Sequence, residues 1–242
     1  MQGRLDKVVS TLGLITRSEA QAVIRRGGVA VDGVPCRQPA TKVDTGKQTV
    51  LLAGKALQGD GFAYLMLHKP AGVLSATEDK HGDPTVLDLL PEAYQRIGLG
   101  VVGRLDKDTE GLILLTDNGE LNHRLTSPKY HADKRYLARL DLPADDSDRA
   151  AFAEGMDLGD FTTLPAVLEP GETPLEWYVT IREGKFHQVK RMFSAVGCEV
   201  VKLHRETFGS LTLDPNLPEG EWRELTGDEL SALYSDAQME VK

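Results

Sequence analysis

Residues 103–119 read GRLDKDTEGLILLTDNG, a cluster of charged residues directly before an apolar run. Strands are predicted on both sides of this cluster, at 99–106 and at 111–119, and a turn signal closes the second. Apolar flanks tend to bury what they enclose, and a buried carboxylate needs a cationic or hydrogen-bonding partner. The cluster is therefore a candidate site. The plain alternative is a polar turn in which Asp106 or Asp108 caps backbone groups.

Outward from this stretch, strands and helices are mixed without the strict alternation of a doubly wound fold. Periodicity and turn signals predict strands at 64–70, 134–142, 176–183 and 199–205, and helices at 85–91, 118–126, 146–156 and 186–197, with a C-terminal helix starting at Thr226-x-x-Glu229. This order favours an α+β domain with a mostly antiparallel sheet.

The composition narrows the class of protein. The chain has 242 residues, of which 40% are hydrophobic, so it can bury a core and is not disordered. No run approaches about 18 apolar residues, and the start lacks the pattern of a signal peptide. We therefore expect a cytoplasmic protein without membrane contact. Cys36 and Cys198 form no C-x-x-C pair and are expected to be reduced, buried thiols.

The sequence contains no strong cofactor or metal motif. It has no P-loop, no H-E-x-x-H and no G-x-S-x-G, and its six histidines show no metal-ligand spacing. Gly98-x-Gly100-x-x-Gly103 matches the dinucleotide fingerprint in letters, but a polar segment precedes it and a predicted strand follows it. We expect neither a metal nor an organic cofactor, and chemistry that side chains perform alone.

The charge is divided unevenly along the chain. The formal net charge is −9, with +4 in the first 60 residues and −13 in the remainder. A small basic block joined to a larger acidic one suggests two domains, at 1–58 and 62–242, with a Gly-containing linker at 53–61. The alternative is a single domain whose charges happen to segregate.

The basic block has the local signals of a compact module. A short helix is predicted at 4–12, Thr16 and Glu19 have the spacing of a capping box, and residues 29–34 have the pattern of a hairpin around Asp-Gly. The candidate RNA contacts of this module are the cations Lys7, Arg17, Arg25 and Arg26. An ordinary solvated face is the alternative, and the excess of one sign makes phosphate contact equally plausible.

The predicted helix 186–197 has two faces. Val189, Met192, Phe193 and Val196 form an apolar stripe, whereas His187, Lys190 and Arg191 lie on a basic face. Residues 182–205 carry +4 and residues 120–140 carry +3, so basic stretches persist inside the acidic block. Ordinary surface charge would explain either stretch alone. Together with the N-terminal module they favour an anionic polymer as the partner.

Three segments make the chain similar to a known family. GRLDKDTEGLILLTDNG, KRYLARL (134–140) and FHQVKRMFSAVGCEVVKLHRETFGSLTL (186–213) together resemble the bacterial pseudouridine synthases of the RsuA type. Residues 4–34 resemble the RNA-binding module named after ribosomal small-subunit protein four. The resemblance covers nearly the whole chain, in the family's order.

The resemblance implies roles for five residues. Asp106 matches the family's essential aspartate, and Tyr136 matches the tyrosine that stacks on the target base. Lys190 lies where a basic residue pairs with that aspartate, and Leu203 matches the apolar residue under the base. Arg104 is expected to help hold the displaced duplex or a phosphate. An ionised aspartate can attack the sugar, attack the base or remove a proton from the ribose, and the residue types are compatible with all three routes.

The resemblance also implies a reaction and a partner. Pseudouridine formation is an isomerisation that needs no cofactor. The implied partner is 16S rRNA, in a partly assembled small ribosomal subunit. The alternatives are 23S rRNA as substrate, a non-catalytic ribosome-assembly factor, and an enzyme acting on a free nucleoside. We expect a monomer, because no predicted helix has a spare apolar face.

Overall fold

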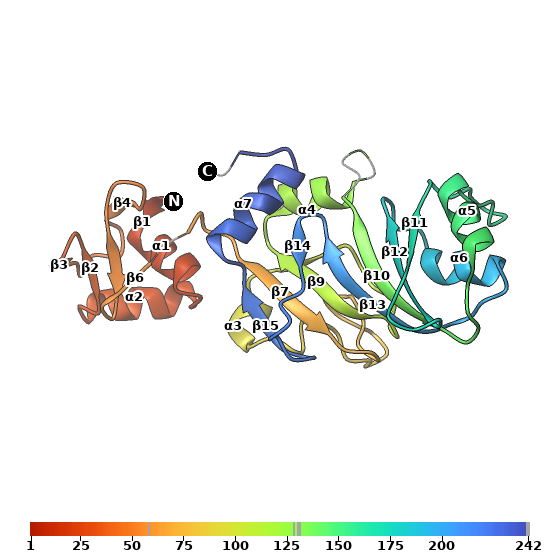
Figure 1. The fold of residues 1–242 in the computed structure, drawn as a ribbon. Helices are drawn as coiled ribbons and strands as arrows, with labels where there is room; N and C mark the ends of the chain where they lie inside the picture. The colour runs from red at the N-terminus through yellow and green to blue at the C-terminus, as the bar shows by residue number, and fades with distance from the viewer. Residues whose placement is uncertain (58, 128, 130–131, 241–242) are drawn as a thin grey trace. The chain divides into compact units, whose positions relative to one another are not determined.

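The computed structural model describes residues 1–57, 59–127, 129 and 132–240 (Figure 1). The chain divides into two compact units, of which the first comprises Met1–Ala63 and Pro91–Gly98. The second comprises Tyr64–Leu90 and the described residues from Leu99 onward. The domain limits expected from the sequence, 1–58 and 62–242, stay predictions, and each unit is described by itself below.

The first unit contains two small sheets and two principal helices. Its elements are β1 (Gln2–Arg4), α1 (Leu5–Leu12), α2 (Arg17–Arg25), β2 (Val29–Val31), β3 (Val34–Pro35), β4 (Lys42–Asp44), β5 (Val50–Leu52), β6 (Lys55–Ala56) and the short α3 (Glu92–Gln95). Strand β1 pairs with β4, and the other four strands are ordered β3-β2-β5-β6. The predicted capping box at Thr16 and Glu19 and the hairpin of β2 and β3 are both confirmed.

The second unit is built on a nine-stranded sheet. Its strands are β7 (Tyr64–Lys69), β8 (Gly100–Val102), β9 (Glu110–Thr116), β10 (Lys134–Leu140), β11 (Val167–Pro170), β12 (Glu176–Ile181), β13 (Val200–Phe208), β14 (Leu211–Thr212) and β15 (Trp222–Glu224). The main order is β11-β12-β10-β13-β9-β7-β15, with β14 on β13 and β8 on β9. Every pairing is antiparallel except that of β13 with β9, which confirms the mostly antiparallel sheet predicted from the sequence.

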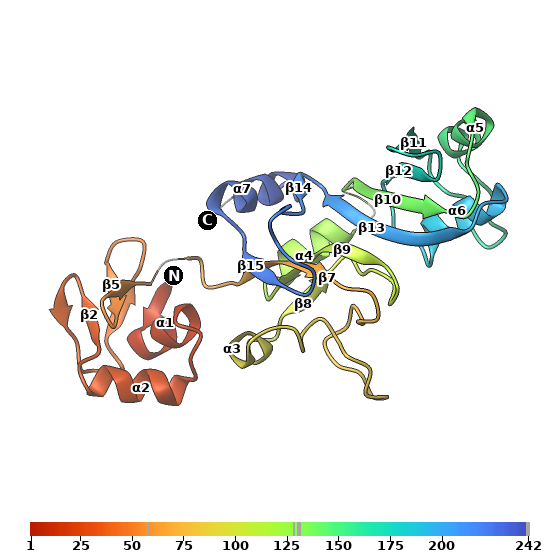
Figure 2. The same cartoon turned by 60° about the horizontal axis from the view of Figure 1, so that its bottom comes forward.

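Four helices complete this unit, α4 (Gly119–Thr126), α5 (Asp146–Glu154), α6 (Gln188–Ala195) and α7 (Gly227–Asp236). Figure 2 shows α5 and α6 beside the β10–β12 end of the sheet, and α4 and α7 beside the β7–β9 end. Each helix pair covers one apolar core. Phe152 and Phe193 pack in the first core, and Leu121 and Leu233 pack in the second. None of the helices in the described part of the chain has the length and apolarity needed to cross a membrane.

The two halves of the sheet meet where β9 runs parallel to β13 over two residue pairs, His204 with Glu110 and Arg205 with Gly111. Gly111 has φ of +107°, and a Cβ atom there would lie 2.3 Å from the backbone oxygen of Arg205. Only glycine fits this close approach. A glycine is therefore required at position 111, where the two halves of the sheet join.

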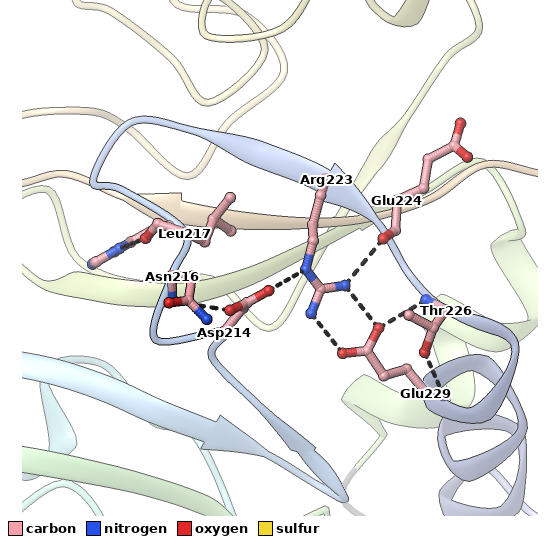
Figure 3. Close-up of polar contacts among 8 residues, drawn as sticks. Asp214, Asn216, Leu217, Arg223, Glu224, Thr226 and Glu229 are labelled. Carbon is pink, nitrogen blue, oxygen red and sulfur yellow. Dashed lines mark hydrogen bonds and ion pairs between the residues drawn. The ribbon is translucent and has the colours of Figure 1, made fainter.

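Ionic contacts attach the C-terminal strand to the last helix (Figure 3). The Arg223 guanidinium of β15 donates to the Asp214 carboxylate at 2.8 Å and to both carboxylate oxygens of Glu229 in α7 at 2.7 and 2.8 Å. The Glu229 carboxylate also accepts from the Thr226 backbone N–H, so the predicted capping box is confirmed. Arg223 thus joins a loop, a strand and a helix N-terminus.

The structure corrects several predictions about individual elements. The helix predicted at 85–91 is a series of turns, because the Asp88 and Leu90 N–H groups bond carbonyls three residues back, at 85 and 87, and residue 85 bridges to Leu74. The strand predicted at 99–106 ends at Val102, and residues 103–109 form a loop. Strand β13 continues to Phe208, beyond the predicted end. Cys198 is buried as predicted, but Cys36 is half-exposed on the smaller first unit.

Candidate active site

The loop at residues 103–109, between β8 and β9, carries the acidic motif and is fixed by side chains from elsewhere. The Ser75 hydroxyl donates to the Leu105 carbonyl at 2.8 Å and accepts from the Leu105 N–H at 3.0 Å. The Arg205 guanidinium donates to the Gly103 carbonyl at 2.7 Å and to the Leu112 carbonyl at 2.8 Å. These bonds leave the loop little freedom to move away from the sheet.

Lys69, at the end of β7, holds the other side of the loop. Its ammonium donates to the carbonyls of Pro70, Lys107 and Thr109 at 3.0, 3.1 and 2.8 Å. The side chain is fully buried, and this burial lowers its pKa to about 8, although nearby carboxylates including Asp106 act in the opposite direction. Burial likewise lowers the pKa of Arg205. Two buried cations therefore fix the loop through its backbone oxygens.

Asp106 and Asp108 of the loop share one cation. The Lys190 ammonium of α6 lies 2.5 Å from an Asp108 oxygen and 3.3 Å from an Asp106 oxygen. The hydrogen bond from Lys190 holds the pKa of Asp108 below its usual range. The His187 Nε2 atom lies 3.7 Å from the other Asp106 oxygen. The side chains of Asp106 and Asp108 therefore face Lys190 and His187 at the start of α6.

Tyr136 and Leu203 come from neighbouring strands, β10 and β13. Both side chains are buried, and both line a small pocket with Arg104, Asp106 and Lys190. The structure thus brings together all five residues for which the resemblance implied a role.

The pocket opens into a groove with a volume of about 800 Å³. Five lining residues are cations and two are acids, namely Arg104, Lys134, Arg182, Lys185 and Arg205 against Asp106 and Glu183. The domain is acidic in total, but this groove has a positive excess. Such a surface attracts an anionic ligand.

Other predicted RNA contacts lie outside this groove or are already paired. The Arg191 guanidinium bonds the Asp160 carboxylate and the Leu158 carbonyl, and it does not line the groove. In the first unit, Arg17 pairs with the fully buried Asp6 at 3.2 Å. Lys7, Arg25 and Arg26 are exposed there. Their contacts with RNA stay predictions.

Sequence reasoning missed the residues that hold the loop, Lys69, Ser75 and Arg205. A signal for two of them was present. Lys69 ends an apolar strand immediately before a proline, and Arg205 lies in a predicted strand. Lysine and arginine are seldom fully buried unless they have partners. Among the described residues, no group of three His, Cys, Asp or Glu side chains has the arrangement of a metal site.

Comparison with known proteins identifies the class. A family model described as RNA pseudouridylate synthase matches residues 63–195, and a model of the S4 domain matches residues 3–48. The chain belongs to the RNA pseudouridine synthase family, whose reaction is an isomerisation. The resemblance inferred from sequence, including the N-terminal RNA-binding module, is confirmed.

Individual relatives match nearly the full length of the chain. Ribosomal small subunit pseudouridine synthase A of Escherichia coli (strain K12) is 43% identical over 234 residues, covering 95% of this chain and 99% of the relative. An RNA pseudouridine synthase of Bacillus subtilis (strain 168), described as uncharacterized, is 44% identical over 236 residues, covering 95% and 98%. A crystal structure of a pseudouridylate synthase superposes with a TM-score of 0.68 at 38% identity, covering 96% and 99%.

Proposed function

We propose that this protein converts a uridine of 16S rRNA, at U516, to pseudouridine. The observation that carries the proposal is the meeting of Asp106, Lys190, Tyr136 and Leu203 at one pocket in a cation-lined groove. The choice of small-subunit rRNA is supported by the 43% identity to ribosomal small subunit pseudouridine synthase A over nearly all of both chains. We further propose that the substrate is RNA in a partly assembled small subunit.

The reaction breaks the bond between C1′ of the ribose and N1 of uracil and forms one between C1′ and C5. N1 gains a proton and C5 loses one, so atoms and electrons balance without a co-reactant. Asp106 acts as an ionised carboxylate beside the reacting base. The Lys190 ammonium lies 3.3 Å from the Asp106 carboxylate and can hold it in position beside the base.

Tyr136 and Leu203 hold the uracil while it is detached. The base must leave its stack to reach the pocket, which costs a few kcal/mol. Stacking on an aromatic ring such as Tyr136 returns roughly 1–3 kcal/mol. The buried Leu203 excludes water beneath the base, which keeps the free uracil in place for reattachment.

Because the conversion leaves the mass unchanged, the test uses chemical derivatisation that marks pseudouridine in rRNA. Purified protein is incubated with unmodified 16S rRNA, with 23S rRNA and with small-subunit particles. We expect a mark at U516 in 16S rRNA, formed faster in particles. Asp106→Asn should bind the RNA and form no pseudouridine, whereas Asp228→Asn, at an exposed aspartate of α7, should match the wild type.

The alternative outcomes are distinct. A mark in 23S rRNA alone would overturn the small-subunit target. RNA binding without a mark in either RNA would indicate a non-catalytic assembly factor. Conversion of free uridine by the wild type would indicate a nucleoside enzyme. Conversion by Asp106→Asn would reject the role of that carboxylate.

A further inference from the structure

An aromatic ring lies unprotected at the rim of the groove. Phe186 is 74% exposed, and no other large hydrophobic side chain of the described residues is more exposed. Burial of a phenylalanine ring is favourable, so nothing in folding alone favours this placement. A single exposed apolar residue is common on protein surfaces. The orientation and the surroundings of the ring must therefore decide whether it has a function.

The Phe186 ring is stacked on the imidazole of His187. The ring centroids are 3.8 Å apart and the planes differ by 18°. His187 takes a left-handed backbone conformation, with φ of 50° and ψ of 30°, directly before α6 begins at Gln188. This conformation is unfavourable for residues other than glycine and is often found at functional sites. It also explains why the helix predicted from residue 186 starts two residues later.

The stacked pair belongs to the same groove as the proposed reaction centre. The His187 Nε2 atom lies 3.7 Å from Asp106, and both rings line the groove together with Tyr136. The exposed cation Lys185 lines the groove nearby, as does Arg182, which is paired with Asp133 at 3.1 Å. A nucleotide at this rim would find aromatic rings for its base and cations for its phosphate.

We propose that Phe186 and His187 form a stacking platform for the nucleotide base next to the target uridine. The inference rests on the proposed function, because it requires an RNA whose uridine leaves the stack. That departure uncovers one face of an adjacent base. The ring separation of 3.8 Å is close to the repeat of about 3.4 Å between stacked bases, so a base on the open face of Phe186 would continue the stack. Such stacking tolerates any base, because every base has a π-face.

Binding is tested with a 16S rRNA fragment that spans U516, in the Asp106→Asn background so that no conversion occurs. Phe186→Leu should weaken binding roughly tenfold, within the range for one lost stack, and Phe186→Trp should restore it. Leu142→Ala removes an apolar side chain that is 54% exposed in the second unit, outside the groove lining, and should leave affinity unchanged. The thermal midpoints of all variants should agree, because neither Phe186 nor Leu142 is buried.

A coupling experiment identifies the base. The nucleotide on the 5′ side or on the 3′ side of the target is replaced by an abasic one. Protein that keeps Phe186 should bind the abasic RNA roughly tenfold more weakly than the intact RNA at one of the two positions. With that abasic RNA, Phe186→Leu should cause no further loss of affinity. Equal losses from Phe186→Leu with intact and both abasic RNAs would overturn the platform, as would unchanged binding by Phe186→Leu.

Activity separates this proposal from the one it rests on. With Asp106 present, Phe186→Leu should raise KM about tenfold with little change in kcat, because the ring does not touch the reacting atoms. If the wild type converts the RNA and Phe186→Leu has the same KM and kcat, the platform is overturned and the proposed function stands. Absence of conversion by the wild type would overturn the proposed function and the platform with it.

Discussion

Single side chains decide the geometry of the acidic loop. Lys69 is the clearest case, since its buried ammonium binds three backbone carbonyls of residues 70, 107 and 109. A loop displaced by about 1 Å can cost about a hundredfold in rate when it carries a reacting group. We therefore expect Lys69 to position Asp106 rather than to touch the RNA.

Lys69→Met keeps the chain length and apolar stem but removes these donors. We expect kcat to fall at least tenfold while RNA affinity changes less than about threefold, measured by single-turnover conversion and by equilibrium binding. Thermal stability should also fall, because buried carbonyls lose their partner. Lys80→Met, at an exposed lysine, is the control. An unchanged kcat would show that Ser75 and Arg205 suffice to hold the loop.

Lys190 lies between two carboxylates, and its nearer partner is Asp108 rather than Asp106. Lys190→Ala should slow conversion by roughly a hundredfold and weaken RNA binding less than tenfold, because the cation acts on Asp106 and not mainly on phosphate. Lys190→Arg should recover part of the rate. If affinity and rate fall together, Lys190 is instead a phosphate contact.

At the scale of elements, Arg223 stabilises the packing of β15, the Asp214 loop and α7 (Figure 3). The Arg223 hydrogen bonds lower the pKa of Glu229 from 4.5 to about 2. A depressed carboxyl pKa stabilises the fold above about pH 4.5, and that contribution is lost as the pH falls through 2.

Arg223→Gln should therefore lower the free energy of unfolding by roughly 1–3 kcal/mol at pH 7. The difference from the wild type should shrink between pH 4.5 and 2, as Glu229 takes up a proton in both proteins. Denaturant unfolding at several pH values measures this. Arg96→Gln breaks an exposed pair with Glu92 and should show little effect at any pH. A difference that does not vary with pH would mean that Arg223 acts through packing alone.

Elements whose ends are marked by residues close in sequence were predicted correctly. Elements whose ends depend on distant contacts or on an unusual backbone conformation were not. The capping boxes at Thr16 and Thr226 depend on residues three positions apart, and both formed. The helix predicted at 85–91 was wrong, because residues 88 and 90 bond carbonyls three residues back and the segment pairs with Leu74, which local spacing does not reveal. Helix α6 began late because residue 187 adopted a left-handed conformation that spacing does not reveal.

At the scale of the whole molecule, charge is divided between a basic first unit and an acidic second unit with a basic groove. Removing residues 1–57 should leave the second unit folded and reduce RNA affinity at least tenfold. It should also flatten the dependence of log affinity on log salt, because phosphate contacts are lost. Binding across a salt series and circular dichroism measure both effects.

The gentler variant Arg25→Gln/Arg26→Gln keeps the module and should reduce the same salt slope by less. It preserves the test if the truncated chain fails to fold. Undiminished RNA affinity in both variants would reject the role of the first unit as an RNA tether.

The sequence by itself determined what depends on near neighbours. Turn residues, capping boxes and period-two strands indicated the mixed α+β class, and the charged motif at 103–112 marked the site. Tertiary structure alone decided which distant groups meet there. Lys190 reaches Asp108 across 82 residues, and β9 runs parallel to β13. Strand order depends on burying apolar faces from the whole chain together, so no local spacing encodes it. The role of the buried cations Lys69 and Arg205 likewise depends on loop carbonyls that are distant in sequence.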